Sequence, residues 1–165
     1  MPKNRHRIHA FFRNRSILWG GFLVVCLAGC PGGGRFNPES HRNVMALKHA
    51  HLEFIHEFTE GEEDKTWDLQ QFDKKTEHMD SQFQKALSHS QTLADQPRTS
   101  NIQLLHKTFH DDKELIHQKN RLLTPIENKM LVKPTVQIYD TALEAECIRR
   151  QGPGPGEACI PEGRP

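Results

Sequence analysis

The chain lacks several features that would place it in a common functional class. Its longest apolar run, about 11 residues from Ile17 onward, is too short for a transmembrane helix, which needs roughly 20 apolar residues. It has no Gly-x-Ser-x-Gly, no His-Glu-x-x-His and no glycine-rich phosphate loop after a strand, the motifs that most directly indicate an enzyme. No alternation of period two persists over a useful length. We therefore expect no spanning helix, no enzyme and no β-fold.

The N-terminal region has basic residues but no acidic ones. Its five basic side chains are Lys3, Arg5, Arg7, Arg13 and Arg15. The apolar run from Ile17 follows and ends in the small residues Ala28 and Gly29. A basic stretch, a short apolar region and small residues at its end are typical of a secretory signal peptide. We therefore expect residues 1–29 to be a cleaved signal.

Leu27-Ala28-Gly29-Cys30 closes this segment and resembles the lipobox of bacterial lipoproteins. The resemblance covers only about the first 30 residues, and it implies a diacylglycerol group on the thiol of Cys30. It also implies cleavage between Gly29 and Cys30, so that the lipidated cysteine becomes the mature N-terminus and Cys26 is lost. The alternatives are an ordinary cleavable signal with a chance cysteine, and a buried apolar segment of a soluble domain.

The lipid would hold the mature protein on a membrane surface, because two or three acyl chains bind a bilayer firmly whereas one binds reversibly. Residue 31 is proline and not aspartate, so by the same resemblance the inner-membrane retention signal is absent. We therefore expect an outer-membrane location facing the periplasm if the source has two membranes. Apart from the covalent lipid on Cys30, we expect no cofactor.

Loss of residues 1–29 changes the charge of the chain. The segment contains five of the 22 basic residues and none of the 21 acidic ones. The mature chain therefore keeps 17 basic and 21 acidic residues, a formal charge of −4. Nucleic-acid binding needs clustered Lys and Arg to neutralise phosphates. We therefore expect no nucleic-acid partner.

Two cysteines, Cys147 and Cys159, remain once Cys26 is removed and Cys30 carries lipid. An even pair in an exported protein predicts a disulfide, and the Gly- and Pro-rich residues between them favour a turn. The alternative is two free thiols in a mobile tail. Residues 151–165 are expected to be irregular, because repeated Gly and Pro prevent regular structure.

Apolar residues recur at spacings of three and four over residues 38–150, which predicts one all-α domain. The residues of the first stripe are Val44, Leu47, His51, Phe54 and Phe58. We expect an antiparallel bundle of three long helices and a kinked fourth, behind a flexible tether at residues 30–37. In the third helix Asp112 and Lys119 interrupt the apolar seam.

Four start or stop signals place the helices. Asn37 before Pro38 starts the first helix, and the second runs from about 65 to 95. Ser100 caps the third, and Thr124 with Glu127 forms a capping box for the fourth. Pro134 predicts a break near Lys133, followed by a final helix from about Thr135 to Arg150.

Histidine is the one residue type that invites an active-site prediction, since nine remain in the mature chain. His106 and His110 have the four-residue spacing at which two imidazoles can share a metal, completed by Asp111 or Glu114, with His117 two turns beyond His110. On the helical repeat set by Ile102, Leu105 and Phe109, His110 and His117 point towards solvent, which favours a solvated polar face over a metal site. His49 and His56 lie outside the first apolar stripe, whereas His51 is expected in the core.

These patterns leave two main functional hypotheses. The first is a lipid-anchored cell-envelope protein that presents helical faces to a protein partner, as a scaffold or assembly accessory factor. The alternative is a periplasmic metal-binding or stress-sensing lipoprotein that uses the histidine-rich faces. A third possibility is a domain that folds only on its partner.

Overall fold

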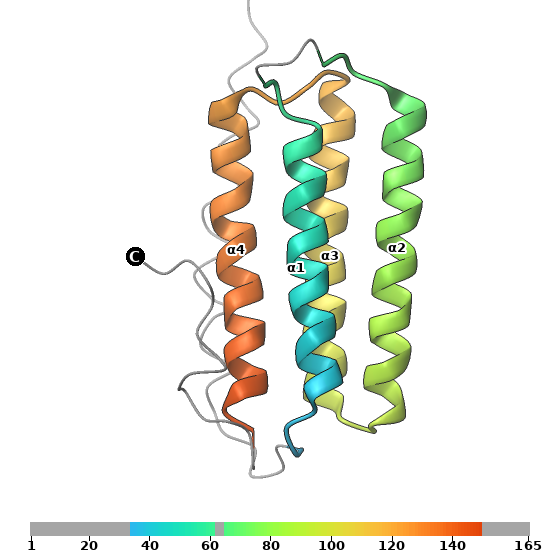
Figure 1. Ribbon diagram of the computed structural model, residues 1–165, viewed down its shortest axis with the longest axis vertical. Coiled ribbons are helices and arrows are strands. Elements are labelled where there is room, and N and C mark those ends of the chain that lie inside the picture. The colour runs from blue at the N-terminus through green and yellow to red at the C-terminus, as the bar shows by residue number, and fades with distance from the viewer. Residues whose placement is uncertain (1–33, 62–64, 150–165) are drawn as a thin grey trace, which may run out of the picture. The chain divides into compact units, whose positions relative to one another are not determined.

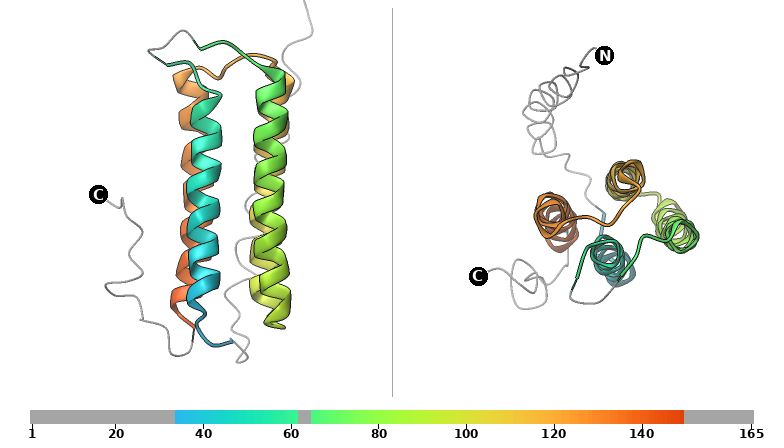
Figure 2. Two further views of the ribbon diagram at one scale, coloured as in Figure 1. Left: turned by 45° about the vertical axis from the view of Figure 1, so that its right-hand side comes forward. Right: turned by 90° about the horizontal axis from the view of Figure 1, so that it is seen from above.

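Four long helices make up most of what the computed structural model describes, residues 34–61 and 65–149. They are α1 (Pro38–Glu57), α2 (Leu69–Thr92), α3 (Gln96–Lys119) and α4 (Pro125–Cys147). Each helix runs antiparallel to the one before it (Figure 1), and the view from above shows consecutive helices side by side around a common centre (Figure 2). The prediction of an all-α antiparallel bundle is confirmed. The apolar stretches of these helices are all too short to cross a membrane.

The predicted starts of α1 and α4 are confirmed. Asn37 Oδ1 accepts a hydrogen bond from the Ser40 N–H at 2.8 Å. Thr124 Oγ1 accepts from the Glu127 N–H at 3.3 Å, and Glu127 Oε2 accepts from the Thr124 N–H at 2.9 Å. Each bond satisfies a backbone N–H that has no partner within the helix. Asp68 caps α2 in the same way, so this helix begins at Leu69, four residues later than predicted.

The predicted cap of the third helix at Ser100 is wrong. Asp95 Oδ1 accepts from the Arg98 N–H at 3.0 Å and caps α3 instead. Pro97 lies in the first turn, where its missing N–H removes no helical hydrogen bond. Ala94 has a φ of 50° and turns the chain between α2 and α3, which explains why no longer loop is needed before the helix starts.

The predicted break near Lys133 is also wrong, because α4 continues through Pro134 to Cys147. Proline removes the N–H that would bond to the carbonyl of Met130. The Met130 side chain is 65 % exposed, so this carbonyl lies on the side of the helix where water can bind it. On the inner side Leu131 and Thr135 are buried, and Thr135 Oγ1 donates to the Leu131 carbonyl at 2.8 Å. Tertiary packing therefore outweighs the local cost of the proline.

Phe109 lies at the centre of the core and is fully buried. Its ring contacts Phe54 on α1 and Phe83 on α2, at centroid distances of 5.2 and 5.6 Å. The predicted stripe of α1 is buried throughout. Leu69 and Leu93 are exposed because they lie at or just beyond the ends of α2.

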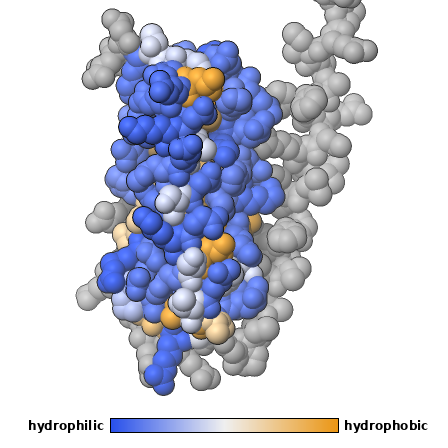
Figure 3. All heavy atoms as spheres, turned by 90° about the vertical axis from the view of Figure 1, so that its right-hand side faces the viewer, coloured by the Kyte–Doolittle hydropathy of each residue, from blue (hydrophilic) through white to orange (hydrophobic). Residues whose placement is uncertain are grey.

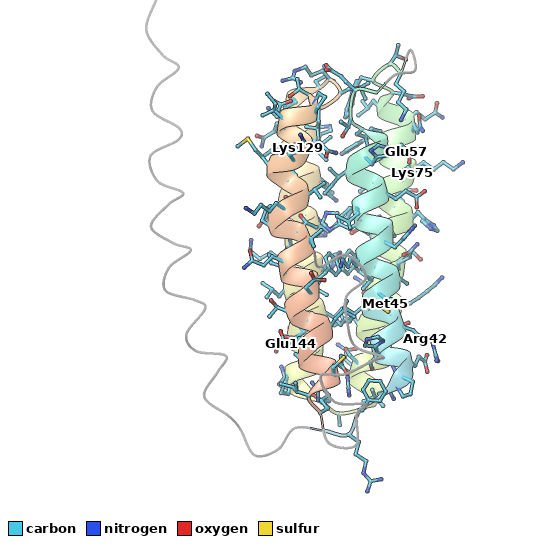
Figure 4. The ribbon with its side chains drawn as sticks, turned by 60° about the vertical axis from the view of Figure 1, so that its left-hand side comes forward. Arg42, Met45, Glu57, Lys75, Lys129 and Glu144 are labelled. Carbon is cyan, nitrogen blue, oxygen red and sulfur yellow. The ribbon has the colours of Figure 1, made fainter. Side chains whose placement is uncertain are left out.

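The two loops at one end of the bundle pair with each other. The Leu123 N–H donates to the Phe58 carbonyl at 2.8 Å, and the Leu123 carbonyl accepts from the Glu60 N–H at 2.8 Å. Beside them Lys75 on α2 forms an ion pair with Glu57 on α1 at 2.7 Å (Figure 4). We call this the loop end; the opposite end, where α1 and α3 begin and α2 and α4 end, is the tether end.

A buried charge network ties the helices together at the tether end. Arg98 on α3 donates from Nε and Nη2 to the two carboxylate oxygens of Glu146 on α4, both at 2.9 Å. Asp95 contacts Arg98 and Arg149, and the side chains of all four residues are at most 6 % exposed. Charges at this depth must be paired, because an unpaired buried ion costs several kcal/mol.

The last four residues of the predicted tether contact the bundle. The Arg35 carbonyl accepts a hydrogen bond from Arg98 Nη2 at 3.2 Å, and Phe36 is half-buried with its ring 6.0 Å from that of His41. Residues 34–37 therefore pack on the bundle. Cys30 and the rest of residues 1–33 lie outside the described residues, so the signal, its cleavage site and the lipid stay predictions.

The described residues cover only part of the C-terminal region. The helix ends at Cys147 and not near Arg150. Cys147 is buried and disulfide-bonded. Its predicted partner Cys159 and the tail at 151–165 lie outside the described residues, so the Cys147–Cys159 pairing stays a prediction.

Replacing Glu146 should destabilise the bundle strongly. Glu146→Ala removes both carboxylate contacts of the buried Arg98 guanidinium, which should lower the free energy of unfolding by about 3 kcal/mol. Glu144→Ala is the matched control, because this exposed residue lies on the same helix (Figure 4) and should change stability by less than about 0.5 kcal/mol. Urea denaturation followed by circular dichroism measures both. Equal losses of stability in the two variants would contradict the proposed contribution of the charge network to the free energy of unfolding.

Candidate metal centre

Asp80, His106 and His110 converge on the outside of the bundle where α2 meets α3. The two histidines lie four residues apart on α3, so successive turns bring them onto one face. Asp80 comes from the facing turn of α2, 26 residues earlier than His106. The antiparallel packing of two consecutive helices thus brings two imidazoles and a carboxylate together.

The ligand atoms of these three residues nearly have the spacing of a metal site. His106 Nε2 lies 2.8 Å from Asp80 Oδ1 and 3.0 Å from His110 Nε2, and His110 Nε2 lies 3.3 Å from Asp80 Oδ1. Around a tetrahedral Zn²⁺ with bonds of 2.0–2.1 Å, ligand atoms lie about 3.3–3.4 Å apart. Two of the three spacings must therefore open by a few tenths of an ångström, which small side-chain rotations provide.

The site is partly buried and open on one side. The side chains of Asp80, His106 and His110 are 33 %, 20 % and 44 % exposed. The His106 ring stacks on Phe83 of α2, with centroids 4.6 Å apart and an interplanar angle of 23°. Packing on a core phenylalanine fixes the orientation of His106, while the exposed edge of His110 leaves room for water as a further ligand.

The same nitrogen atoms can bind either a proton or a metal. An imidazole protonated at Nε2 donates to the Asp80 carboxylate, and loss of that proton makes Nε2 a metal ligand. Burial and the neighbouring Lys113 charge lower the pKa of His110 below its ordinary value of 6.5. A lowered pKa keeps His110 neutral at neutral pH, which is the form that binds a metal.

Lys113 opposes a metal at this site. Its Nζ lies 3.6 Å from Asp80 Oδ2, the carboxylate oxygen other than the one that contacts the histidines, and 5.9 Å from the centroid of the Phe109 ring. A bound cation would share the Asp80 carboxylate with this ammonium group, so like-charge repulsion lowers the affinity. Lys113 also satisfies Asp80 when no metal is bound.

The other residues suggested for this site lie elsewhere. Asp111 accepts a hydrogen bond from Lys107 at 2.7 Å, and Glu114 accepts one from Gln118 at 2.8 Å. The His117 ring lies against Phe72 and is not part of the cluster. The sequence pattern did not indicate Asp80 as the third candidate ligand, because Asp80 lies on another helix. The one signal for it in the sequence is its position next to Met79 on the apolar stripe of α2.

A second histidine–aspartate pair is sealed inside the core. Asp112 Oδ2 lies 3.4 Å from His51 Nε2 and 2.9 Å from Thr135 Oγ1. His51 Nδ1 lies 3.3 Å from the Tyr139 hydroxyl, and burial raises the pKa of Tyr139 far above its usual range. His51 and Tyr139 are fully buried, so these groups hold helices together and have no access to a ligand. The prediction that His51 belongs to the core is confirmed, and Asp112 is its charged neighbour there.

Two hollows in the described part of the chain lie away from the metal cluster. One, of about 10 Å³, lies beside Arg98 and Glu146 and has room for about one water molecule. The other is an open depression of about 520 Å³ at the loop end, lined by charged side chains such as Glu57 and Lys75. Comparison with known protein families, curated proteins and solved structures finds no match for this chain.

The pH dependence of zinc binding should depend on Lys113. The native protein should bind Zn²⁺ at neutral pH and lose it as the pH falls below about 6.5, where protons compete for the imidazoles. Lys113→Met removes a positive charge that lowers the pKa of His110. The pKa of His110 should therefore rise, and zinc should begin to dissociate at a higher pH. At pH 7.5 the affinity should rise on the order of tenfold, because the repulsion between Lys113 and the metal is gone.

Lys107→Met is the matched control for this experiment. It removes the same charge from the same helix, but Lys107 pairs with the exposed Asp111, so affinity and pH profile should stay near those of the native protein. Isothermal calorimetry from pH 5 to 8 measures all three proteins. Identical profiles for the two lysine variants would contradict the role given to Lys113.

Proposed function

We propose that this protein is a lipid-anchored cell-envelope protein that binds a divalent transition-metal ion at Asp80, His106 and His110. The observation that carries the metal proposal is the convergence of the three side chains, whose candidate ligand atoms all lie within 4.8 Å of one another. The lipobox-like sequence before Cys30 supports the anchor. Together they favour a metal-binding protein held on a membrane surface, which is the outer membrane facing the periplasm if the source has two membranes.

The donor set selects the class of metal. Two imidazole nitrogens and one carboxylate oxygen suit Zn²⁺, Cu²⁺, Ni²⁺ or Co²⁺. Ca²⁺ takes six to eight oxygen ligands and Mg²⁺ prefers an octahedral oxygen shell, so neither matches this site. Three protein ligands leave at least one position for water, which favours reversible binding over the closed shell of a structural zinc site.

We propose binding and not catalysis for this site. An enzyme of small molecules usually encloses its substrate in a concave pocket, whereas the cluster lies on the outer surface between α2 and α3. The two hollows described above are lined by other residues. Reversible metal binding, in a sensing or buffering role, needs no such pocket.

Zinc should stabilise the protein through all three ligands. In calorimetry on the tag-free mature protein, Asp80→Asn, His106→Ala and His110→Ala should each weaken binding by about 100-fold, since each removes one of three ligands. At zinc concentrations of 100 times Kd, the native protein should gain about 2.7 kcal/mol of stability. At the same zinc concentration the gain should fall to about 0.4 kcal/mol in the variants, because their weakened Kd then equals the zinc concentration.

His49→Ala is the control for surface histidines. The His49 side chain is 85 % exposed on α1 and lies 3.7 Å from Glu53, so its loss should leave zinc binding unchanged. If the double variant His106→Ala, His110→Ala binds zinc as the native protein does, the proposed site is wrong.

Partner binding is a second candidate, supported by exposed apolar residues at the loop end. Ile126 and Met130 lie on successive turns of α4 and are 73 % and 65 % exposed. The face over α2 is largely hydrophilic, with isolated apolar side chains (Figure 3). If α4 contacts a protein partner as a scaffold or assembly factor, its apolar pair is the better candidate surface.

A photo-cross-linking residue at position 130 tests this candidate in cells. It should yield a discrete adduct that the same residue at position 144, exposed near the other end of α4, does not yield. The adduct should disappear in an Ile126→Glu background, because a charge would disrupt an apolar contact. Recovery of the monomer alone from position 130 would contradict partner binding through this surface.

A further inference from the structure

The chain is held against the bundle from Gly34 onward. The Arg35 carbonyl is bound by Arg98, which is itself buried between Asp95 and Glu146. Gly34 lies so close to the Asp95 carboxylate that a Cβ added to it would collide with the Asp95 oxygen. A side chain at this position would displace the Asp95 carboxylate, so the first described residues are fixed on the buried charge network.

Little chain separates this point from the proposed lipid. From Cys30 to Gly34 there are four residue steps, which span at most about 14 Å in any conformation. Helices of 24 residues, such as α2 and α3, are about 36 Å long. Because the reach of the linker is less than half the length of the bundle, the lipid must lie near the tether end.

Resting on the proposed lipid anchor at Cys30, we infer that the tether end of the bundle lies against the lipid headgroups of the membrane and the loop end points away from it. The exposed side chains at the tether end include Leu93, Ile148 and Arg35, of which Ile148 is 68 % exposed. Apolar and cationic side chains both suit the headgroup region of a bilayer. The occupant of this surface is thus the membrane that holds the lipid.

This orientation places the other surfaces of the protein. His106 and His110 lie 10 and 14 positions after the start of α3 at Gln96, about 15 and 21 Å along the helix axis from the tether end. The metal cluster then faces the aqueous compartment, beyond the headgroups. Ile126 and Met130, near the start of α4 at the loop end, are held furthest from the bilayer, where a soluble partner can reach them.

Energy transfer from tryptophan to a dansyl-labelled lipid headgroup tests the orientation. The chain has two tryptophans; Trp19 leaves with the signal, so Trp67 is the only donor of the mature protein, and it lies at the loop end just before α2. The purified lipidated protein is reconstituted in phosphatidylethanolamine–phosphatidylglycerol vesicles. Transfer from Trp67 should be weak, and transfer in the variant Trp67→Phe, Ile148→Trp should be several-fold stronger.

Two further proteins keep the test independent of any one substitution. Trp67→Phe, Leu93→Trp places the donor on the α2–α3 turn and should also give strong transfer. Ten Gly-Ser residues inserted between Gly33 and Gly34 should weaken transfer from position 148, because a longer linker releases the bundle from the surface. Circular dichroism checks that each variant is folded.

The outcomes separate the anchor from the orientation. Mass spectrometry of the mature N-terminus should show the lipid on Cys30; an unmodified N-terminus with protein free of vesicles overturns the anchor and this orientation with it. With the lipid present, equal transfer from positions 67 and 148, or stronger transfer from 67, overturns the orientation alone. Strong transfer from positions 93 and 148 that the longer linker reduces supports it.

Discussion

The burial of four apolar helix faces around Phe109 is the interaction on which the rest of the structure depends. Phe109 on α3 contacts the rings of Phe54 from α1 and Phe83 from α2, and it makes a T-shaped contact with His51. Burying an aromatic side chain of this size stabilises a fold by about 1.5–3 kcal/mol. The Phe83 ring also stacks on His106, so the same contacts bring α2 against α3 near the turns that carry Asp80 and His106.

Apolar stripes alone would allow neighbouring helices to slide by a turn, and buried polar groups oppose such shifts. His51 and Asp112 meet in the middle of the bundle, and Arg98 meets Glu146 at the tether end. A helix that slipped by one turn would leave at least one of these groups buried without its partner, at a cost of several kcal/mol. The polar contacts therefore select one packing among several that are equally apolar, which is the role best attested for such groups.

The protein uses histidine and aspartate twice, and exposure separates the two uses. His51 and Asp112 lie among Thr135 and Tyr139, where no ligand can reach them. The metal cluster of His106, His110 and Asp80 lies at the edge of the same seam. One side of each imidazole ring is packed and the other meets water. The packed side supplies orientation and the open side supplies access, so only the second group suits a metal.

Local chemistry in the sequence determined the helical class, the caps at Asn37 and Thr124 and most of the buried stripe, because these depend on residues within a turn or two of each other. The spacing of His106 and His110 is also local. Only the tertiary structure decided that Asp80 joins them, that Asp112 pairs with His51 and that Pro134 stays inside a helix. Each of these depends on which turns of two different helices face each other, and that register comes from packing the whole core and not from any single stretch of chain.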